Sequence, residues 1–281
     1  MANYAWCTDI HLDHLRNEDE IVKFAETLIE KDPTGIFITG DISEAYDIVY
    51  HLSILERVTQ RPIYFVLGNH DYYQGDIASV RKSMNEMMNM SSFLVYMSQR
   101  PYVVLSPKTA LVGHDCWYDA QHGTPIPSRF LMSDWFLIKD FVKFSGGKSF
   151  IYMNRDVADA KGLIQHARSL AQEGVNHIAS GIKAAAVRHE NIVILTHYPP
   201  FKESHIFEEK LGDEISQPWF TNKLLGDTLL SAAKTYPNVN FTVLAGHTHG
   251  EYEGNPLPNL TVQVGAAEYG KPKLSKLIEI K

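Results

Sequence analysis

The sequence predicts an α/β fold. Short apolar runs of strand length alternate along the chain with segments whose apolar residues recur at helical spacing. Polar clusters follow several of these runs directly, at the strand ends where α/β proteins bind ligands. The chain has 281 residues, of which 44% are hydrophobic and 21% charged, so it is long enough to bury a substantial core.

The opening third is expected to read β-α-β-α-β. Buried strands are expected at residues 4–8, 35–39 and 63–67, because these runs are short, apolar and often β-branched or aromatic. Helices are expected at residues 18–31 and 45–59. Asn17 is a candidate N-cap for the first helix, and the acidic residues that follow it suit the positive end of the helix dipole.

The second half repeats the strand signal. Strands are expected at residues 191–195, 241–245 and 260–264, and a pair of strands within 101–113. A helical region is expected over about 155–188, interrupted near Gly174 or Gly181, and another helix over 222–234. We predict one domain over 1–281, with a loop and helix elaboration at about 116–150 that contains a short helix near 133–141.

Composition limits the classes of function. The net charge of −7 gives no general attraction to nucleic acid or to an anionic membrane, although a local basic patch stays open. Cys7 and Cys116 are too few for a disulfide framework and fit a reducing compartment. Neither a signal peptide nor an apolar run of membrane-spanning length is apparent, so we expect a cytoplasmic protein; the oligomeric state stays open.

Five polar clusters stand at the ends of expected strands. In chain order they are Asp9-Ile10-His11, Gly40-Asp41, Gly68-Asn69-His70-Asp71, Thr196-His197 and Gly246-His247-Thr248-His249. Each alone is weak evidence, because Gly-Asp is usually a turn and a single histidine is often a core residue. Their order and shared position indicate one metal site built from carboxylate, imidazole and amide ligands.

These motifs resemble the calcineurin-like metallophosphoesterase superfamily, whose ordered pattern is D-x-H, G-D, G-N-H-[D/E], H and G-H-x-H. The resemblance implies a four-layer α/β/β/α sandwich of two mixed sheets flanked by helices. It also implies two divalent or trivalent transition-metal ions, with Mn, Fe and Zn all open. The first ion would be held by Asp9, His11 and His249, the second by Asn69, His197 and His247, and Asp41 would bridge the two.

The implied reaction is hydrolysis of a small or medium organic phosphate by a hydroxide that bridges the metals. His70 would protonate the leaving oxygen or stabilise the transition state. Glu44 stands three positions after the Gly-Asp aspartate, where the family often has an acid that orients this histidine. Asp71 is the competing candidate for that role.

Further residues are candidates for substrate contacts. His114 and Asp115 follow an apolar strand, Arg129 has the chemistry of a phosphate clamp, and Tyr198 adjoins a motif histidine. Tyr72 and Tyr73 could stack on a substrate ring or serve as packing residues, and His14 is expected to be a loop residue near the site.

The motifs look closer to the phosphodiesterase-like branches than to the Ser/Thr phosphatases, because the arginine-bearing extensions of the latter are missing. A monoesterase and a diesterase both fit these motifs. A metal-dependent nuclease is a second hypothesis, disfavoured by the acidic chain without a basic run. A catalytically silent metal-binding scaffold is a third, disfavoured because the chain keeps every ligand and the Asn-His histidine.

Overall fold

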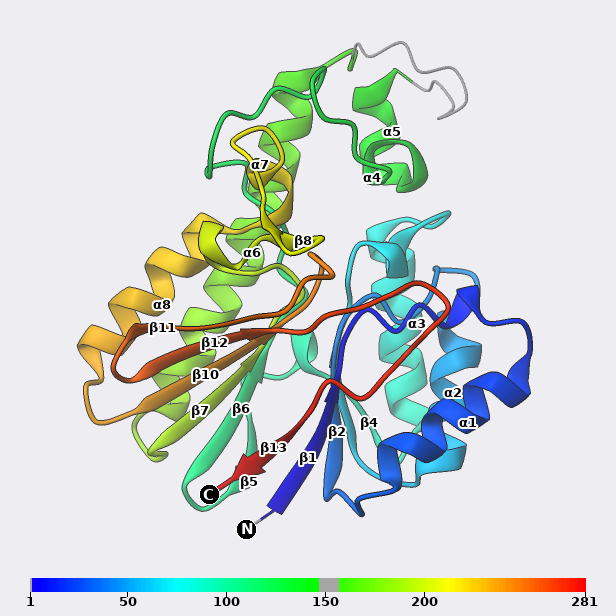
Figure 1. Ribbon diagram of the computed structural model, residues 1–281, viewed down its shortest axis with the longest axis vertical. Helices are drawn as coiled ribbons and strands as arrows, with labels where there is room; N and C mark the ends of the chain where they lie inside the picture. The colour runs from blue at the N-terminus through cyan, green and yellow to red at the C-terminus, as the bar shows by residue number, and fades with distance from the viewer. Residues whose placement is uncertain (1, 147–156) are drawn as a thin grey trace.

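The structure is a computed structural model that describes residues 2–146 and 157–281. Two large sheets dominate it (Figure 1). The five-stranded sheet has the order β13-β1-β2-β3-β4, and the six-stranded sheet has the order β11-β12-β10-β7-β6-β5. Parallel pairing joins β1 to β2, β2 to β3, β3 to β4, β6 to β7, β7 to β10 and β10 to β12, while β13, β11 and β5 pair antiparallel with their neighbours.

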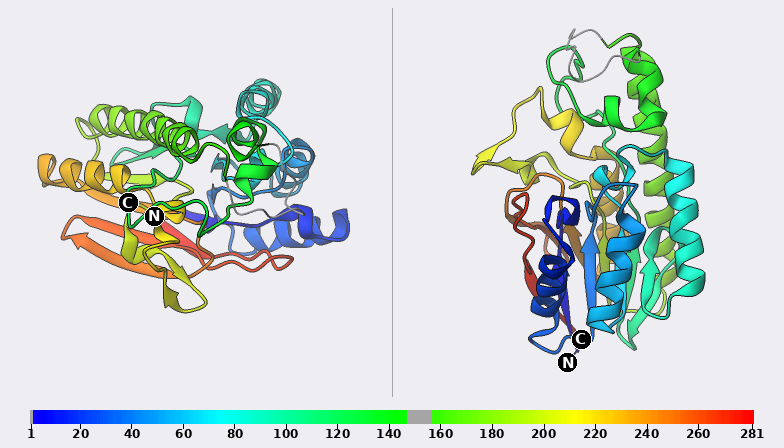
Figure 2. Two further views of the ribbon diagram at one scale, coloured as in Figure 1. Left: turned by 90° about the horizontal axis from the view of Figure 1, so that it is seen from above. Right: turned by 90° about the vertical axis from the view of Figure 1, so that its right-hand side faces the viewer.

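Helices cover the outer face of each sheet, as Figures 1 and 2 show. The helices beside the five-stranded sheet are α1 (Glu18–Ile29), α2 (Ile48–Thr59) and α3 (Ile77–Met90). Those beside the six-stranded sheet are α6 (Ala160–Ala185) and α8 (Lys223–Thr235). Between the two sheets lies a cluster of buried residues that includes Trp6, Phe37, Leu111 and Leu244. The predicted four-layer sandwich is therefore confirmed.

The expected strands form nearly where the sequence indicates. They are β1 (Ala2–Cys7), β2 (Gly35–Thr39), β3 (Ile63–Val66), β5 (Val103–Ser106), β6 (Thr109–Gly113), β7 (Asn191–Leu195), β10 (Asn240–Ala245) and β12 (Leu260–Val264). The N-cap prediction is also confirmed, because the Asn17 side chain accepts a hydrogen bond from the backbone N–H of Glu20 at 3.1 Å.

The sequence did not indicate α3, β4 (Leu94–Tyr96), β11 (Tyr252–Leu257) or β13 (Lys276–Ile280). The three strands are edge or near-edge elements with mixed burial, so their apolar pattern is weak. Helix α3 buries one face only, with Ile77, Val80, Met84 and Met87. Its polar Asn and Ser residues conceal that stripe in the sequence.

The predicted interruption of the long helix is wrong, because α6 continues through Gly174 and Gly181. Both glycines serve close packing instead. A Cβ on Gly174 would lie 2.8 Å from Nδ1 of His114, and a Cβ on Gly181 would meet the backbone oxygen of Pro101. The predicted start of the region near residue 155 lies outside the described residues.

The elaboration sits above the sheets in Figure 1. Its described part, 116–146, contains α4 (Asp134–Leu137) and α5 (Lys139–Ser145), where one short helix was expected, and the nearby α7 (Gln217–Phe220) joins it. Residues 147–150 lie outside the described residues. Trp117, Trp135 and Phe141 share one buried cluster with core residues of the five-stranded sheet, so the elaboration packs onto that core. The single domain stays a prediction.

Short elements complete the chain: the 3₁₀ turns Leu12–His14, His70–Tyr72, Met97–Gln99 and Lys202–Ser204, and a hairpin of β8 (Ile206–Phe207) and β9 (Lys210–Leu211). Within residues 2–146 and 157–281, none of the helices is both long enough and apolar enough to cross a membrane.

Candidate metal centre

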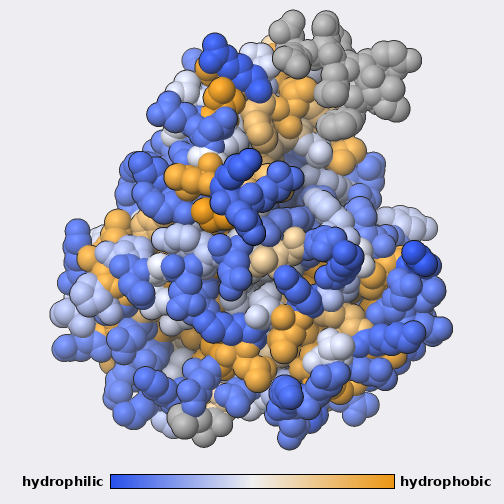
Figure 3. All heavy atoms as spheres, viewed as in Figure 1, coloured by the Kyte–Doolittle hydropathy of each residue, from blue (hydrophilic) through white to orange (hydrophobic). Residues whose placement is uncertain are grey.

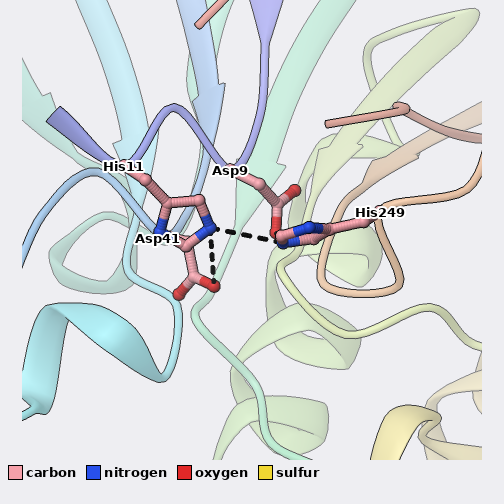
Figure 4. A group of neighbouring side chains, drawn as sticks. All are labelled: Asp9, His11, Asp41 and His249. Carbon is pink, nitrogen blue, oxygen red and sulfur yellow. Dashed lines mark hydrogen bonds and ion pairs between the residues drawn. The ribbon is translucent and has the colours of Figure 1, made fainter. Parts of the chain in front are cut away.

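The five polar clusters meet at one end of the two sheets. The clusters that contain Asp9, Asp41 and Asn69 follow β1, β2 and β3, and those of His197 and His247 follow β7 and β10. Figure 4 shows Asp9, His11, Asp41 and His249 turned toward one another from both sheets. This convergence follows from parallel pairing, which puts the carboxyl ends of neighbouring strands at the same edge.

The backbone at these strand ends is unusual. Five side chains of the predicted ligand set stand on residues with positive φ, with values of 48° for Asp9, 38° for His11, 50° for Asp41, 71° for His247 and 59° for His249. Residues other than glycine avoid this region because of steric crowding, and such strain concentrates at functional sites. The left-handed turns direct these side chains back over the strand ends.

Gly68 permits the close approach of two of these turns. A Cβ at this position would collide with Oδ1 of Asp41. The carboxylate of Asp41 also accepts a hydrogen bond from the backbone N–H of His70 at 2.9 Å, and Oδ1 of Asp9 accepts one from the N–H of His247 at 2.9 Å. The motif loops therefore fix the two carboxylates through main-chain donors.

The first group comprises Asp9, His11, Asp41 and His249. Nε2 of His11 lies 3.2 Å from Nε2 of His249 and 3.9 Å from Oδ2 of Asp41. Nε2 of His249 lies 3.5 Å from Oδ1 of Asp9. A single cation between these atoms can accept a lone pair from each of them.

The second group shares Asp41 with the first and adds His197 and His247. Nε2 of His197 lies 3.4 Å from Oδ1 of Asp41 and 3.1 Å from Oδ1 of Asn69. Nδ1 of His197 lies 2.9 Å from the backbone oxygen of Thr39 and donates to it, which turns Nε2 toward the group. The structure thus brings all seven predicted ligands together, with Asp41 common to both groups.

Burial and the close pairing of Asp41 with histidines together set the pKa values of the site. Burial lowers the pKa of His11 to about 2, and it lowers that of His247 well below its usual value, with neighbouring His197 adding to the effect. Burial alone would raise the pKa of Asp41, but the surrounding histidines outweigh it and hold that pKa well below its usual value. His11 and His247 are therefore neutral, while at His197 the Asp41 carboxylate outweighs burial and raises the pKa to about 9, so a metal ion would have to displace the proton from that imidazole.

These donors fit two transition-metal ions. They are imidazole nitrogens, carboxylate oxygens and one amide oxygen, with no thiolate, which suits Mn, Fe or Zn in a catalytic site. The Nε2 atoms of His11 and His249 face each other at 3.2 Å within a buried cluster, and a shared cation would bind both lone pairs.

His70 borders the first group. Its ring lies 4.6 Å from that of His11 and 4.2 Å from that of Tyr73, centroid to centroid, and its Nε2 lies 3.4 Å from the Tyr269 hydroxyl. Burial lowers its pKa, which Asp41 and Asp13 oppose. The nearby carboxylates are thus Asp41 and Asp13, and Asp13 also lies 3.4 Å from the exposed His14.

Neither acid expected to orient His70 is placed to do so. Asp71 is fully buried and accepts hydrogen bonds from the backbone N–H groups of Ile42, Ser43 and Gly68, at 2.9, 2.9 and 2.7 Å. Its carboxylate is a clamp between two motif loops. Glu44 lies in the electrostatic range of Asp13 and His14, and no described contact joins it to His70.

The structure does not bring the four expected substrate contacts to the cavity beside the metal centre. Asp115 is buried and accepts hydrogen bonds from the hydroxyls of Tyr72 and Ser98 and from the backbone N–H of Leu67. His114 is buried next to it. Arg129 is exposed outside the cavity, and Tyr198 packs under the ring of His247 with centroids 4.2 Å apart.

That cavity measures about 210 Å³. It is lined by Asp41, Asn69, His70, Tyr73, Phe130, Leu131, Met132, Ser133, Phe220, His247, His249 and Tyr269. Sequence reasoning missed its apolar residues, because no motif marks them. It also missed Asp134 and Tyr269. In the sequence, Ser133-Asp134 looks like an ordinary helix start, and Tyr269 lies in a loop outside any motif.

Comparison with known proteins bears on this geometry. A sequence model described as calcineurin-like phosphoesterase matches residues 2–251. The chain belongs to the calcineurin-like phosphoesterase family. Membership makes it a hydrolase of phosphoric esters with a dinuclear metal site. A search of curated proteins returned no match.

Two solved structures share the fold of this calcineurin-like phosphoesterase. A phosphopantetheinyl hydrolase from Mycobacterium tuberculosis is 15% identical, with a TM-score of 0.63 over 95% of this chain and 90% of that one. A dimetal phosphatase from Danio rerio is 10% identical, with a TM-score of 0.56 over 96% of this chain and 89% of that one. At these identities the likeness concerns the fold alone.

Proposed function

We propose that this calcineurin-like phosphoesterase hydrolyses a small or medium organic phosphodiester. The observation that carries the proposal is the pair of ligand groups that share Asp41 at the floor of an open cavity. Asp9, His11 and His249 would hold one ion, Asn69, His197 and His247 the other, and Asp41 both. When bound, the two ions lower the pKa of water and neutralise charge on the phosphoryl oxygens.

The protein's own groups would supply the remaining steps. The imidazole of His70 stands at the cavity wall, between the first ligand group and the Tyr269 hydroxyl. From there it can donate a proton to the departing ester oxygen. The ring of Tyr73 packs against it at 4.2 Å and limits its rotation. Buried carboxylates and backbone donors keep the ligand loops in place before the substrate binds.

The preference for a diester rests on charge. The cavity lining contains no lysine or arginine among the described residues, so the metal ions would supply all the positive charge. A diester carries one negative charge at neutral pH and a monoester close to two. Lacking a further cation, the site suits the singly charged ester better.

The test combines metal analysis with hydrolysis. Purified protein reconstituted with Mn²⁺ should bind about two ions per chain, as dinuclear sites of this ligand type do. It should cleave bis(4-nitrophenyl) phosphate faster than 4-nitrophenyl phosphate. Fewer than one ion per chain, or cleavage of neither ester, would overturn the proposal. Faster cleavage of the monoester would overturn only the diester preference.

A further inference from the structure

The cavity beside the metal centre has two chemically different walls. One wall consists of the ligand residues and His70. The other wall is apolar: Phe130, Leu131 and Met132 come from the elaboration and Phe220 from the end of α7. The rings of Phe130 and Phe220 meet edge to face with centroids 5.7 Å apart, so they form one continuous surface.

Nothing charged interrupts the apolar wall. Apart from the predicted ligands and His70, the described residues that line the cavity are the four apolar ones, Ser133, Tyr73 and Tyr269. A further phosphate or carboxylate placed there would lose hydration without gaining a partner. Figure 3, drawn in the view of Figure 1, shows apolar residues at the surface in the upper part of the molecule, where Figure 1 places the elaboration.

We propose that the apolar wall binds an uncharged, apolar or aromatic ester group of the substrate. This inference rests on the proposed function, because it names the class of ester that the same site would cleave. Burial of such a group against Phe130 and Phe220 would contribute hydrophobic binding free energy. Nucleoside polyphosphates and sugar bisphosphates would put a second anionic group against this wall and should bind poorly.

Three phosphonates with one organic group each test the wall by direct binding. Isothermal titration calorimetry of the Mn²⁺-loaded protein would compare methyl-, phenyl- and 4-carboxyphenylphosphonate. Burial of one aromatic ring predicts that the phenyl compound binds roughly 10-fold more tightly than the methyl compound. The added carboxylate should remove that gain. Equal affinities for the methyl and phenyl compounds, or tightest binding of the carboxyphenyl one, would overturn the inference.

Variants tie the preference to its residues. Phe130→Ala should reduce the phenyl-to-methyl affinity ratio roughly fivefold, because it removes one face of the wall. Phe207→Ala is the matched control, since this phenylalanine is 54% exposed on β8 and does not line the cavity, and it should leave the ratio unchanged. Selective binding without cleavage of any nitrophenyl ester would count against the proposed function and not against the wall.

A separate observation concerns Asp134, which the elaboration contributes to the metal centre. Its carboxylate is fully buried, and its Oδ1 accepts hydrogen bonds from Nδ2 of Asn69 at 2.9 Å and from the Tyr73 hydroxyl at 2.9 Å. A carboxylate oxygen accepts hydrogen bonds and cannot donate them, so it binds the NH₂ side of the Asn69 amide. The amide oxygen is thereby left facing Nε2 of His197, at 3.1 Å.

We infer that Asp134 is a positioning residue that selects the metal-binding orientation of Asn69. An amide rotated by 180° would present its NH₂ group, which cannot bind a cation. The same carboxylate holds Tyr73, whose ring packs on His70, so one buried group orients both a ligand and the neighbour of the proton donor. The elaboration is thus part of the metal centre.

Metal affinity measures this role independently of turnover. Loss of a partner that orients a ligand typically weakens metal affinity about 10- to 100-fold, so Asp134→Ala should raise by that factor the Mn²⁺ dissociation constant of the ion that Asn69 would hold. Asp119→Ala is the control: Asp119 is equally buried in the elaboration and accepts from the backbone N–H of Leu224 at 2.7 Å, away from the ligands. It should leave metal affinity unchanged.

An exchange of the two side chains gives a sharper test. Asn69→Asp alone places two carboxylates together and should weaken binding. Asn69→Asp combined with Asp134→Asn restores a donor–acceptor pair in the reverse sense and should recover most of the affinity lost in Asn69→Asp. Unchanged affinity in a folded Asp134→Ala protein, or no recovery in a folded double variant, would overturn the assignment.

Discussion

At the scale of single residues, His70 is the motif residue that lines the cavity without being a proposed metal ligand. His70 belongs to the Gly-Asn-His-Asp motif, yet its backbone N–H binds Asp41 while its ring projects beside Tyr73 and Tyr269. This separation of a fixed main chain from a cavity-facing ring suits a group that transfers a proton during the reaction.

His70→Ala should therefore lower kcat without loss of metal. General acid catalysis contributes about 10²- to 10⁴-fold, so we expect a decrease of that order on bis(4-nitrophenyl) phosphate. Metal content by mass spectrometry should stay at the wild-type value. The control is His177→Ala, whose ring contacts the backbone oxygen of Arg100 away from the site. A variant with both metals and undiminished kcat would contradict the role.

Asp115 illustrates a buried charge whose role is structural. Besides accepting hydrogen bonds from Tyr72, Ser98 and Leu67, its carboxylate lies 3.7 Å from Nε of Arg81. It joins the ends of β3 and β6 to α3, and so connects the two sheets just behind the metal centre. Its position after a strand looked like a cleft position in the sequence, but the strand end points inward here.

Asp115→Ala should lower the free energy of unfolding by about 3–5 kcal/mol, because it leaves the hydroxyls of Tyr72, Tyr96 and Ser98 without their acceptor and removes a carboxylate from beside the partly buried Arg81. Urea denaturation at pH 7 measures this. Glu253→Ala removes an ion pair with Lys276 on the surface and should change stability by less than about 0.5 kcal/mol. A comparable loss in both variants would refute the assigned role.

At the scale of elements, α6 shows how packing overrides local preference. Glycine lowers helix stability by roughly 1 kcal/mol relative to alanine, and for this reason the sequence predicted a break. The helix continues because Gly174 and Gly181 let it approach the segment around Cys116 and the strand β6.

Gly174→Ala should accordingly destabilise the protein, against the usual effect of this change in a helix. The new Cβ would lie 2.9 Å from both Cα and Sγ of Cys116, and overpacking of this kind costs about 1–3 kcal/mol. Ser180→Ala, at an exposed position of the same helix, should be neutral or slightly stabilising. Thermal unfolding distinguishes the two; a higher Tm for Gly174→Ala would show that the helix can shift.

At the scale of the whole molecule, metal ions would tie the two sheets together. Asp9, His11, Asp41 and Asn69 stand on the five-stranded sheet, and His197, His247 and His249 on the six-stranded sheet. Both ligand groups combine residues from the two sheets. Binding to the folded state alone therefore stabilises the contact between the halves of the sandwich.

Addition of Mn²⁺ to metal-free protein should raise Tm. Saturation at about 100 times the dissociation constant contributes roughly 2.7 kcal/mol per site, or a shift of at least about 5 °C for a chain of this size. Ca²⁺, which prefers oxygen ligands, should give a much smaller shift. His197→Ala and His249→Ala, one from each group, should each reduce the Mn²⁺ response. Equal shifts with both cations would contradict a nitrogen-rich centre.

The strands that carry the motifs, and the predicted ligand set at their ends, can be read from the amino-acid sequence alone. Short apolar runs encode their own burial, and ligands placed directly after parallel strands must converge at one sheet edge. The residues that surround the predicted ligand set become known only from the folded chain. Asp134, Phe130, Phe220 and Tyr269 come from loops and short helices whose positions depend on packing across the chain. The roles of Asp71 and Asp115 also became clear only from the fold, because tertiary neighbours fix the direction of a side chain that follows a strand.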